Sequence, residues 1–194
     1  IKSKNQIIGI CGPSGSGKTT LIDLLIGLLI PKQGNIYADN KRLEFKDQNF
    51  QLFGYVPQNT FLFDDSIKNN IMITSEKEQI PVEQYQKTLA QSELIDFVSS
   101  LDNKDETMLG ENGVRISGGQ KQRIGIARAL ISQPKILIFD EATSALDQKI
   151  EENIFKTIKD LSSKTSVIVI SHNERIWKYC TELYKLTDGK LIKK

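Results

Sequence analysis

One run of residues has the composition and spacing needed to hold phosphate groups. Residues 12–19 read Gly-Pro-Ser-Gly-Ser-Gly-Lys-Thr, after an apolar run and before a helical pattern. Glycines let successive backbone N–H groups turn toward one centre, and the N-terminus of the following helix adds partial positive charge. Lys18 would bring a full charge to the β- and γ-phosphates, and the Thr19 hydroxyl would ligate Mg²⁺. The run predicts a nucleotide-binding P-loop, with these residues at the site: Gly12, Pro13, Ser14, Gly15, Ser16, Gly17, Lys18, Thr19 and Thr20.

Two carboxylates follow another apolar run. Residues 136–139 read Ile-Leu-Ile-Phe, and Asp140 and Glu141 come directly after them. A buried strand would deliver Asp140 to the edge of the sheet beside the phosphate loop, where it can hold Mg²⁺ directly or through water. Glu141 could then polarise a water molecule for in-line attack on the γ-phosphate. On their own, two acids of this kind are more often a solvated strand end, but their pairing with the phosphate loop favours a catalytic role.

A second helix start also has features that attract anions. Ser117, Gly118 and Gly119 precede Gln120 at the beginning of a helix predicted over 119–131. The first N–H groups of a helix lack partners within the helix, and the helix dipole favours negative charge there. The simpler interpretation is that Ser117 is an N-cap and nothing more.

The elements that must position these groups alternate between strand and helix. Strands are predicted over 6–11, 36–38, 52–56, 136–139 and 167–170, with a turn at 39–40 and a final hairpin of 183–186 with 190–192 around Asp188-Gly189. Helices are predicted over 18–29, 66–73, 82–99, 119–131 and 148–161, with Ser66 as an N-cap. This alternation indicates an α/β fold with a mostly parallel sheet. Residues 59–115 are polar, and we expect them to form a helical insertion without a core of its own.

Composition narrows the class of protein. The chain has 194 residues and a net charge of +2, which suits one domain and does not indicate a nucleic acid or anionic membrane partner. Cys11 and Cys180 lack the spacing of a zinc site or a disulfide framework, so a reducing, cytosolic compartment fits best. The longest apolar stretch, 21–30, is shorter than the roughly 20 residues needed to span a bilayer, so we expect no membrane span.

The segment Ile116-Ser117-Gly118-Gly119-Gln120 resembles the signature motif of ABC-type ATPases, with Ile116 where Leu is usual. The whole stretch 116–147 is similar to an ABC transporter nucleotide-binding domain, and the resemblance covers nearly the entire chain from Gln6 on. It implies a P-loop NTPase fold of the ABC type in a single domain over 1–194. Residues 1–58 and 116–194 would form the RecA-like catalytic core, and approximately 59–115 the helical subdomain.

The resemblance also implies roles for further residues. Gln58 matches the Q-loop glutamine, which touches Mg²⁺ and the attacking water, so the expected metal site comprises Thr19, Gln58 and Asp140. His172, the single histidine, lies at the spacing of the switch histidine that contacts the γ-phosphate; such a residue is otherwise usually structural. The expected catalytic set is Lys18, Gln58, Glu141 and His172.

ABC ATPases pair head to tail, so that the signature of one copy closes over the ATP held by the other. Residues 144–147 match the D-loop, which crosses that interface. The residues expected to complete a partner's nucleotide site are therefore Ser117, Gly118, Gly119, Gln120 and Asp147.

Two segments resemble those of exporters rather than importers. Residues 108–113, with their Gly-Glu-x-Gly core, resemble a short exporter loop, and 61–67 resemble the region that meets the coupling helices of the membrane domain. Phe61 and Phe63 could equally be core residues of the helical insertion. The run Asp64-Asp65-Ser66 is similar to flippases of lipid-linked oligosaccharides.

Two departures from the family pattern concern the N-terminus. The family stacks adenine on an aromatic residue upstream of the phosphate loop, but none of the eleven residues before Gly12 is aromatic. The first strands of the usual domain are also absent. We therefore expect an N-terminally truncated piece of a longer polypeptide, with the transmembrane domains in the same parent chain.

The expected function is hydrolysis of ATP with Mg²⁺, to ADP and phosphate, on the cytoplasmic side of a membrane. Two copies would dimerise on ATP and so power an exporter or flippase. Alternatives are a DNA-repair or chromosome ABC ATPase, a translation-associated ABC protein and a non-catalytic nucleotide-gated scaffold. The first carries long coiled coils, and no sustained heptads appear here. The second usually has two such domains per chain, and the presence of Lys18, Glu141 and His172 argues against the third.

Overall fold

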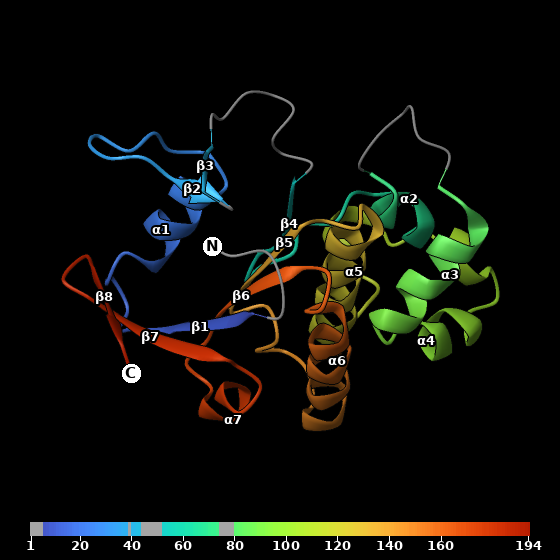
Figure 1. Cartoon of the computed structure of the whole chain (residues 1–194). Coiled ribbons are helices and arrows are strands. Elements are labelled where there is room, and N and C mark those ends of the chain that lie inside the picture. The colour runs from blue at the N-terminus through green and yellow to red at the C-terminus, as the bar shows by residue number, and fades with distance from the viewer. Residues whose placement is uncertain (1–5, 39, 44–51, 74–79) are drawn as a thin grey trace. The chain divides into compact units, whose positions relative to one another are not determined.

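The computed structural model describes residues 6–38, 40–43, 52–73 and 80–194. The chain forms two compact units, shown in Figure 1. The first unit contains 1–55, 134–141 and 158–194, and the second contains 56–133 and 142–157. Among the helices of the described ranges, none combines the length and apolar character that crossing a bilayer requires.

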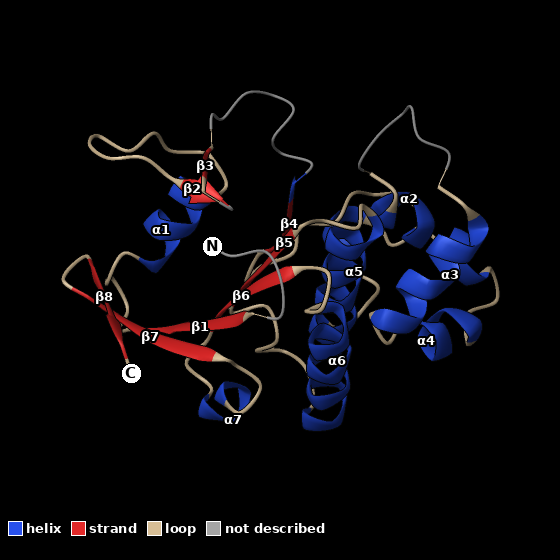
Figure 2. Ribbon diagram, viewed as in Figure 1, coloured by secondary structure: helices blue, strands red, loops and turns tan. Residues whose placement is uncertain are grey.

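A six-stranded sheet is the centre of the first unit (Figure 2). Its strands lie in the order β4-β5-β6-β1-β7-β8. The pairs β5–β6, β6–β1 and β1–β7 are parallel, whereas β7–β8 is antiparallel. The strand bounds are β1 Ile7–Cys11, β4 Phe53–Val56, β5 Ile136–Asp140, β6 Ser166–Ile170, β7 Glu182–Thr187 and β8 Lys190–Lys193. The predicted parallel strands are confirmed with ends that differ by one residue.

Burial explains why the two middle strands are continuous apolar runs. Every residue of β6 is buried, and so are the first four of β5. A strand covered on both faces has no solvent side on which polar residues could alternate. Helix α1 (Lys18–Leu25) contributes Ile22 to the cluster of buried side chains on this sheet. The cluster comprises Ile10, Ile22, Ile26, Ile136, Ile138, Ile168, Ile170 and Leu186.

The predicted end of the first helix is wrong. The apolar spacing suggested a helix over 18–29, but α1 ends at Leu25 with Ile26 as its C-cap. Gly27 has a φ of 83°, the left-handed conformation in which helices commonly stop. Leu28 and Leu29 therefore continue the apolar pattern without continuing the helix, and both side chains are exposed.

The conformation of the turn residues explains the hairpin at the end of the chain. Asp188 and Gly189 both have positive φ, as a two-residue turn between β7 and β8 requires, so the predicted hairpin is confirmed. Strand β2 (Tyr37–Ala38) pairs with β3 (Lys41–Arg42), which the pattern did not predict. Of the predicted turn at 39–40, residue 39 lies outside the described residues. The short helix α7 (Glu174–Trp177) was also not predicted.

The second unit is helical. Its helices are α2 (Ile67–Ile71), α3 (Val82–Gln91), α4 (Ile95–Ser99) and α5 (Gly118–Ile131), with short 3₁₀ turns at Lys104–Glu106 and Glu111–Gly113. Ser66 caps α2 as predicted, because its Oγ accepts a hydrogen bond from the Asn69 N–H at 3.1 Å. The single helix predicted over 82–99 is two helices, because Glu93 has a φ of 57° and breaks the pattern. Helix α6 (Gln148–Leu161) has the predicted bounds and passes from the second unit into the first.

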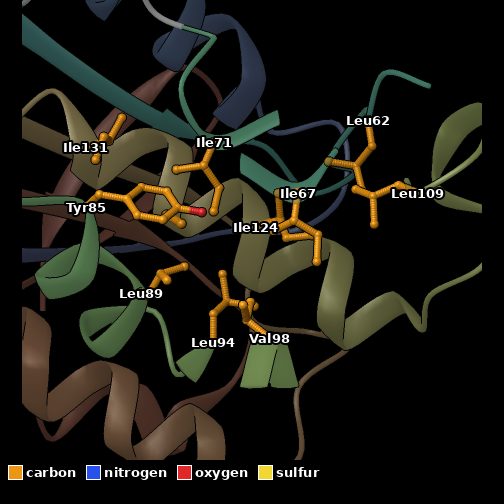
Figure 3. Packing of buried hydrophobic residues seen from close by; sticks show 11 residues of the cluster. Leu62, Ile67, Ile71, Tyr85, Leu89, Leu94, Val98, Leu109, Ile124 and Ile131 are labelled. Carbon is orange, nitrogen blue, oxygen red and sulfur yellow. The ribbon is translucent and has the colours of Figure 1, made fainter. Parts of the chain in front are cut away.

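Residues 59–115 share a hydrophobic core with α5, which lies outside that stretch. Eleven buried hydrophobic residues form one cluster in this unit, which Figure 3 shows at close range. The insertion contributes only part of this cluster. Helix α5 completes it with Ile124, Ala127 and Ile131, around which the apolar side chains of the insertion pack. The remaining members are Leu62, Ile67, Ile71, Tyr85, Leu89, Leu94, Val98 and Leu109.

Helix α5 approaches residue 60 so closely that no side chain fits between them. A Cβ added at Gly125 would lie 2.4 Å from Thr60 Oγ1 and 2.9 Å from Thr60 Cγ2. Thr60 Oγ1 is buried and has no hydrogen-bond partner in the part of the chain that the structure describes. The contact is therefore steric, and the hydroxyl contributes no bond to it.

We expect Gly125→Ala to lower the free energy of unfolding by about 1–3 kcal/mol, because overpacking forces side chains and backbone to shift. Adding Thr60→Ala should restore most of the loss, because it removes the two closest atoms. Urea denaturation of the two single variants and the double variant measures this. A Gly125→Ala variant as stable as the unchanged chain would contradict the predicted clash.

Candidate functional site

The phosphate loop joins β1 to α1 in the first unit. Gly17 is the N-cap of α1 and has a φ of 97°, a conformation that side chains disfavour. The Ser16 N–H donates to the Pro13 carbonyl at 3.2 Å and closes the turn. Thr19 and Thr20 are exposed in the first turn of the helix. The loop thus has the strand–turn–helix context that its sequence predicted.

Polar groups of the loop are available for an anion. Lys18 Nζ donates to the carbonyl oxygens of Gly12 and Pro13, both at 2.9 Å, so the ammonium group is folded back over the loop. Ser16 Oγ is buried and has no partner among the described residues. A buried hydroxyl without a partner in a native structure requires an explanation, and a bound oxygen atom would supply one. The loop therefore fits a phosphate group.

The two acids and the histidine meet at the ends of their strands. Asp140 is the last residue of β5, and its Oδ2 accepts a hydrogen bond from the Tyr55 hydroxyl at 3.1 Å. Glu141 Oε1 lies 2.9 Å from His172 Nε2. The Glu141 N–H donates to the Ile170 carbonyl at 2.9 Å, which extends the β5–β6 pairing by one residue. The structure thus joins two residues that lie far apart in the sequence and were expected to act on the same phosphate.

Negative charge is concentrated at Asp140. Burial raises the pKa of Asp140, and the nearby charges of Glu141 and Asp23 raise it further. The hydrogen bond from Tyr55 and the positive charge of Lys18 oppose this rise in pKa. Burial and the Asp140 charge together raise the pKa of the Tyr55 hydroxyl, which keeps it a donor. A cation held beside these carboxylates would relieve their mutual repulsion.

The side chains present fit Mg²⁺ better than a metal that needs an all-protein cage. Within the described ranges, no three His, Cys, Asp or Glu side chains are arranged to hold a metal ion. Mg²⁺ is commonly bound through one or two carboxylates, with phosphate oxygens and water as the other ligands. Asp140 and the exposed Thr19 are suitable residues for that kind of binding.

Tyr55 is a site residue that the sequence reasoning missed. It lies on β4, the neighbour of β5 in the sheet. A strand over 52–56 was predicted, but its pairing with β5 was not. Only the strand order reveals that the Tyr55 hydroxyl reaches Asp140.

The signature residues begin α5 in the second unit. Ser117 Oγ accepts a hydrogen bond from the Gln120 N–H at 3.2 Å, and Gln120 Oε1 accepts one from the Ser117 N–H at 2.8 Å. Ser117 is therefore an N-cap with a reciprocal capping box, as the simpler interpretation proposed. The same helix start borders a pocket of about 390 Å³. The pocket is lined by Ser117, Gly118, Gly119, Arg123, Ala145, Leu146, Asp147 and Ile150.

The predicted site residues fall into two groups. Lys18, Asp140, Glu141 and His172 belong to the first unit, together with the phosphate loop. The second unit contains Gln58, the signature residues 117–120 and the D-loop residues 144–147. Within that unit, Asp147 Oδ1 accepts a hydrogen bond from the Ile150 N–H at 3.0 Å at the start of α6. Gln58, which was expected at the same nucleotide as Lys18, thus belongs to the unit that contains the signature and D-loop residues.

Comparison with known proteins identifies the family. A family model described as ABC transporter matches residues 2–144. The chain belongs to this family. Its fold is that of an ABC-type ATPase, a P-loop NTPase with a mostly parallel sheet and a helical part, as the sequence predicted.

Relatives of this ABC transporter chain include exporters. It is 40% identical over 189 residues to the alpha-hemolysin translocation ATP-binding protein HlyB of Escherichia coli O157:H7, which covers 96% of the chain and 26% of the relative. It is 38% identical over 191 residues to an ATP-dependent lipid A-core flippase of Photorhabdus laumondii, covering 97% of the chain and 33% of the relative. A solved bacterial Atm1-family ABC exporter with ATP bound matches 97% of the chain and 33% of its own length, at 33% identity and a TM-score of 0.90. The chain therefore spans a third or less of these proteins.

We expect Lys18→Ala to weaken binding of inorganic tripolyphosphate about tenfold or more, because it removes a charged donor from the loop. Isothermal titration calorimetry in metal-free buffer measures this affinity. Lys32→Ala is the matched control, since Lys32 is an exposed lysine of the same unit. Equal affinities of the Lys18 and Lys32 variants would contradict the assigned role of Lys18.

Proposed function

We propose that this chain is the ATP-binding and ATP-hydrolysing domain of an ABC exporter or flippase. The contact of Glu141 Oε1 with His172 Nε2 at 2.9 Å carries this proposal. It provides a carboxylate in a defined orientation in the same unit as a phosphate loop. A nucleotide-gated scaffold would not need such a pair. The relatives, an alpha-hemolysin translocation ATP-binding protein and a lipid A-core flippase, support transport over the DNA-repair and translation alternatives.

Lys18 and the loop backbone would bind the triphosphate of ATP. The ammonium group now bonded to the carbonyls of Gly12 and Pro13 would exchange these neutral acceptors for charged phosphate oxygens. Hydrogen bonds between ionised partners are shorter and stronger than those to neutral acceptors, so the exchange is favourable. The Ser16 hydroxyl would donate to the same group, and Gly12 to Thr20 would surround it.

Thr19, Asp140 and Gln58 would hold Mg²⁺. When bound, Mg²⁺ neutralises negative charge on the β- and γ-phosphates. Tyr55 would orient the Asp140 carboxylate through its 3.1 Å hydrogen bond. Asp140 would thus serve the metal, and Glu141 would remain for the reacting water.

Glu141 would act as the general base. Its carboxylate would accept a proton from the attacking water, and His172 would hold that carboxylate in place and contact the γ-phosphate. Gln58 would help to position the water. The products would be ADP and phosphate.

The same proposal includes a head-to-tail dimer. The pocket bordered by Ser117, Gly119 and Asp147 would receive the γ-phosphate side of a nucleotide bound to a second copy. Gly118 and Gln120 belong to the same helix start. In the division we propose, 1–58 and 116–194 form the catalytic core and 59–115 the helical subdomain. Transmembrane domains in the same parent polypeptide would be the second partner, with this domain on the cytoplasmic side.

We expect Glu141→Gln to keep ATP affinity and to lower kcat at least about 100-fold, because an amide cannot accept the proton from water. The variant should also form a stable dimer with ATP and Mg²⁺, because turnover no longer resets it. Phosphate release and size-exclusion chromatography with light scattering measure the two effects.

Glu83→Gln provides the control for the carboxylate-to-amide change, since Glu83 is exposed on α3. It should leave both ATPase rate and oligomeric state unchanged. A rate of ATP hydrolysis close to normal in the Glu141→Gln variant would contradict the assignment of Glu141 as the general base.

A further inference from the structure

One buried amide on α5 contacts two of the loops that surround it. Gln122 is 4% exposed and lies in the second turn of the helix. Its Oε1 accepts a hydrogen bond from the Ala145 N–H at 3.0 Å. Its Nε2 donates to Ser144 Oγ at 3.4 Å and to the Gln58 carbonyl at 3.5 Å. One side chain thus joins the helix that begins with the signature to the D-loop and to the Q-loop.

The burial of this amide needs these contacts. A buried amide without partners costs free energy, and the neighbouring positions 124–127 of the helix are buried without any polar side chain. An apolar residue would fill position 122 without this requirement for partners. The two loops supply the hydrogen-bond partners that allow a glutamine to be buried at position 122.

The two loops differ in their other contacts with α5. The segment after Gln58 is also held by Thr60 against Gly125 and by Arg128, whose Nη1 donates to the Phe61 carbonyl at 2.9 Å. The D-loop rests on the signature glycines by close packing, since a Cβ added at Gly119 would lie 3.0 Å from the Ala145 carbonyl oxygen. Packing of this kind limits how closely the D-loop can approach α5, but it does not fix the orientation of the D-loop backbone. The hydrogen bond from the Ala145 N–H to Gln122 does fix that orientation, because hydrogen bonds are directional.

We propose that Gln122 is a positioning residue for ATP hydrolysis, which fixes the direction of the D-loop relative to the signature and the Q-loop. The inference rests on the proposed function. Asp147, two residues after Ala145, borders the same pocket as Ser117 and Gly119. A displacement of the D-loop would therefore change the shape of the surface offered to a second copy. Small misplacements of positioning groups lower the rate of the chemical step.

The test compares Gln122→Met with Gln84→Met in the full 194-residue chain. Methionine has a similar volume and lacks the amide. Gln84 is a matched control, because its Nε2 donates to the Ile131 carbonyl at the other end of α5 and reaches neither loop through that bond. Amide hydrogen exchange by mass spectrometry measures the loops, and nucleotide binding and phosphate release measure function.

In Gln122→Met we expect peptides over 143–147 to exchange about fivefold faster, the factor that corresponds to one lost hydrogen bond. Peptides over 57–61 should change less, because Thr60 and Arg128 still hold that segment. We expect kcat to fall about tenfold with ATP affinity within about twofold, because the phosphate loop is unaltered. Gln84→Met should change neither loop exchange nor kcat.

A conservative variant distinguishes the contribution of the amide oxygen of Gln122 from that of its amide nitrogen. Gln122→Glu keeps an oxygen for the Ala145 N–H and loses the donor to Gln58, so it should recover most of the protection of 143–147. Unchanged exchange at 143–147 in Gln122→Met would overturn the proposal. Equal effects of the Met variants at positions 122 and 84 would also overturn it, as would a wild-type kcat in Gln122→Met. Absence of ATPase activity in the unchanged chain would instead reject the proposed function, and the exchange comparison would still decide whether Gln122 holds the D-loop.

Discussion

The pairing of β6 with its two neighbours aligns the groups of the first unit to which we assign the chemistry. Asp140 lies opposite Ile170 across the β5–β6 pair, and Ile10 lies opposite the same Ile170 across the β1–β6 pair. Because all three strands are parallel, the chain leaves them at one edge of the sheet. The phosphate loop, the acid pair and the segment leading to His172 therefore all begin at that edge. A shift of β5 by one residue would turn Asp140 to the other face of the sheet and separate Glu141 from His172.

Helix α5 organises the second unit in a comparable way, but with side chains in place of a backbone ladder. Its apolar face completes the core of the helical insertion, and its polar residues hold the loops. Arg128 bonds to carbonyl oxygens of Phe61 and Asn70, and burial lowers the pKa of its guanidinium. A charged group that is partly withdrawn from water in this way must be compensated by hydrogen bonds, so its partners become structurally specified. The same helix therefore carries both the packing of the unit and the placement of its loops.

Much of the fold and part of the candidate site could be predicted from the sequence. Local signals sufficed where burial or backbone conformation imposes a pattern: the apolar runs of β5 and β6, the glycines of the phosphate loop, the Asp188-Gly189 turn and the Ser66 cap. They failed where one residue overrides a periodic pattern, as at Gly27 and at Glu93, which ends α3 despite the continuing helical spacing. Contacts between distant segments were also out of reach. The Tyr55–Asp140 bond depends on strand order, and the bonds of Gln122 depend on how two loops pack against one helix. The motifs indicated the residues to which we assign the chemistry, whereas the hydrogen-bond partners of those residues became visible only in the structure.

The hydrogen bonds of Lys18 show how the phosphate loop itself positions a long, flexible cationic side chain. An isolated ammonium group would be held by water, and binding phosphate would then require that water to be displaced. Here two carbonyl oxygens of the loop accept from Lys18 at 2.9 Å, so the side chain already lies against the loop. Contacts within the loop thus offset part of the entropy cost of fixing a long, flexible side chain. Neutral carbonyls hold the ammonium less strongly than phosphate oxygens would, so phosphate oxygens could replace them as partners. The loop backbone consequently supplies the N–H groups for an anion. It also supplies the carbonyl oxygens that keep the positively charged Lys18 ammonium group in position.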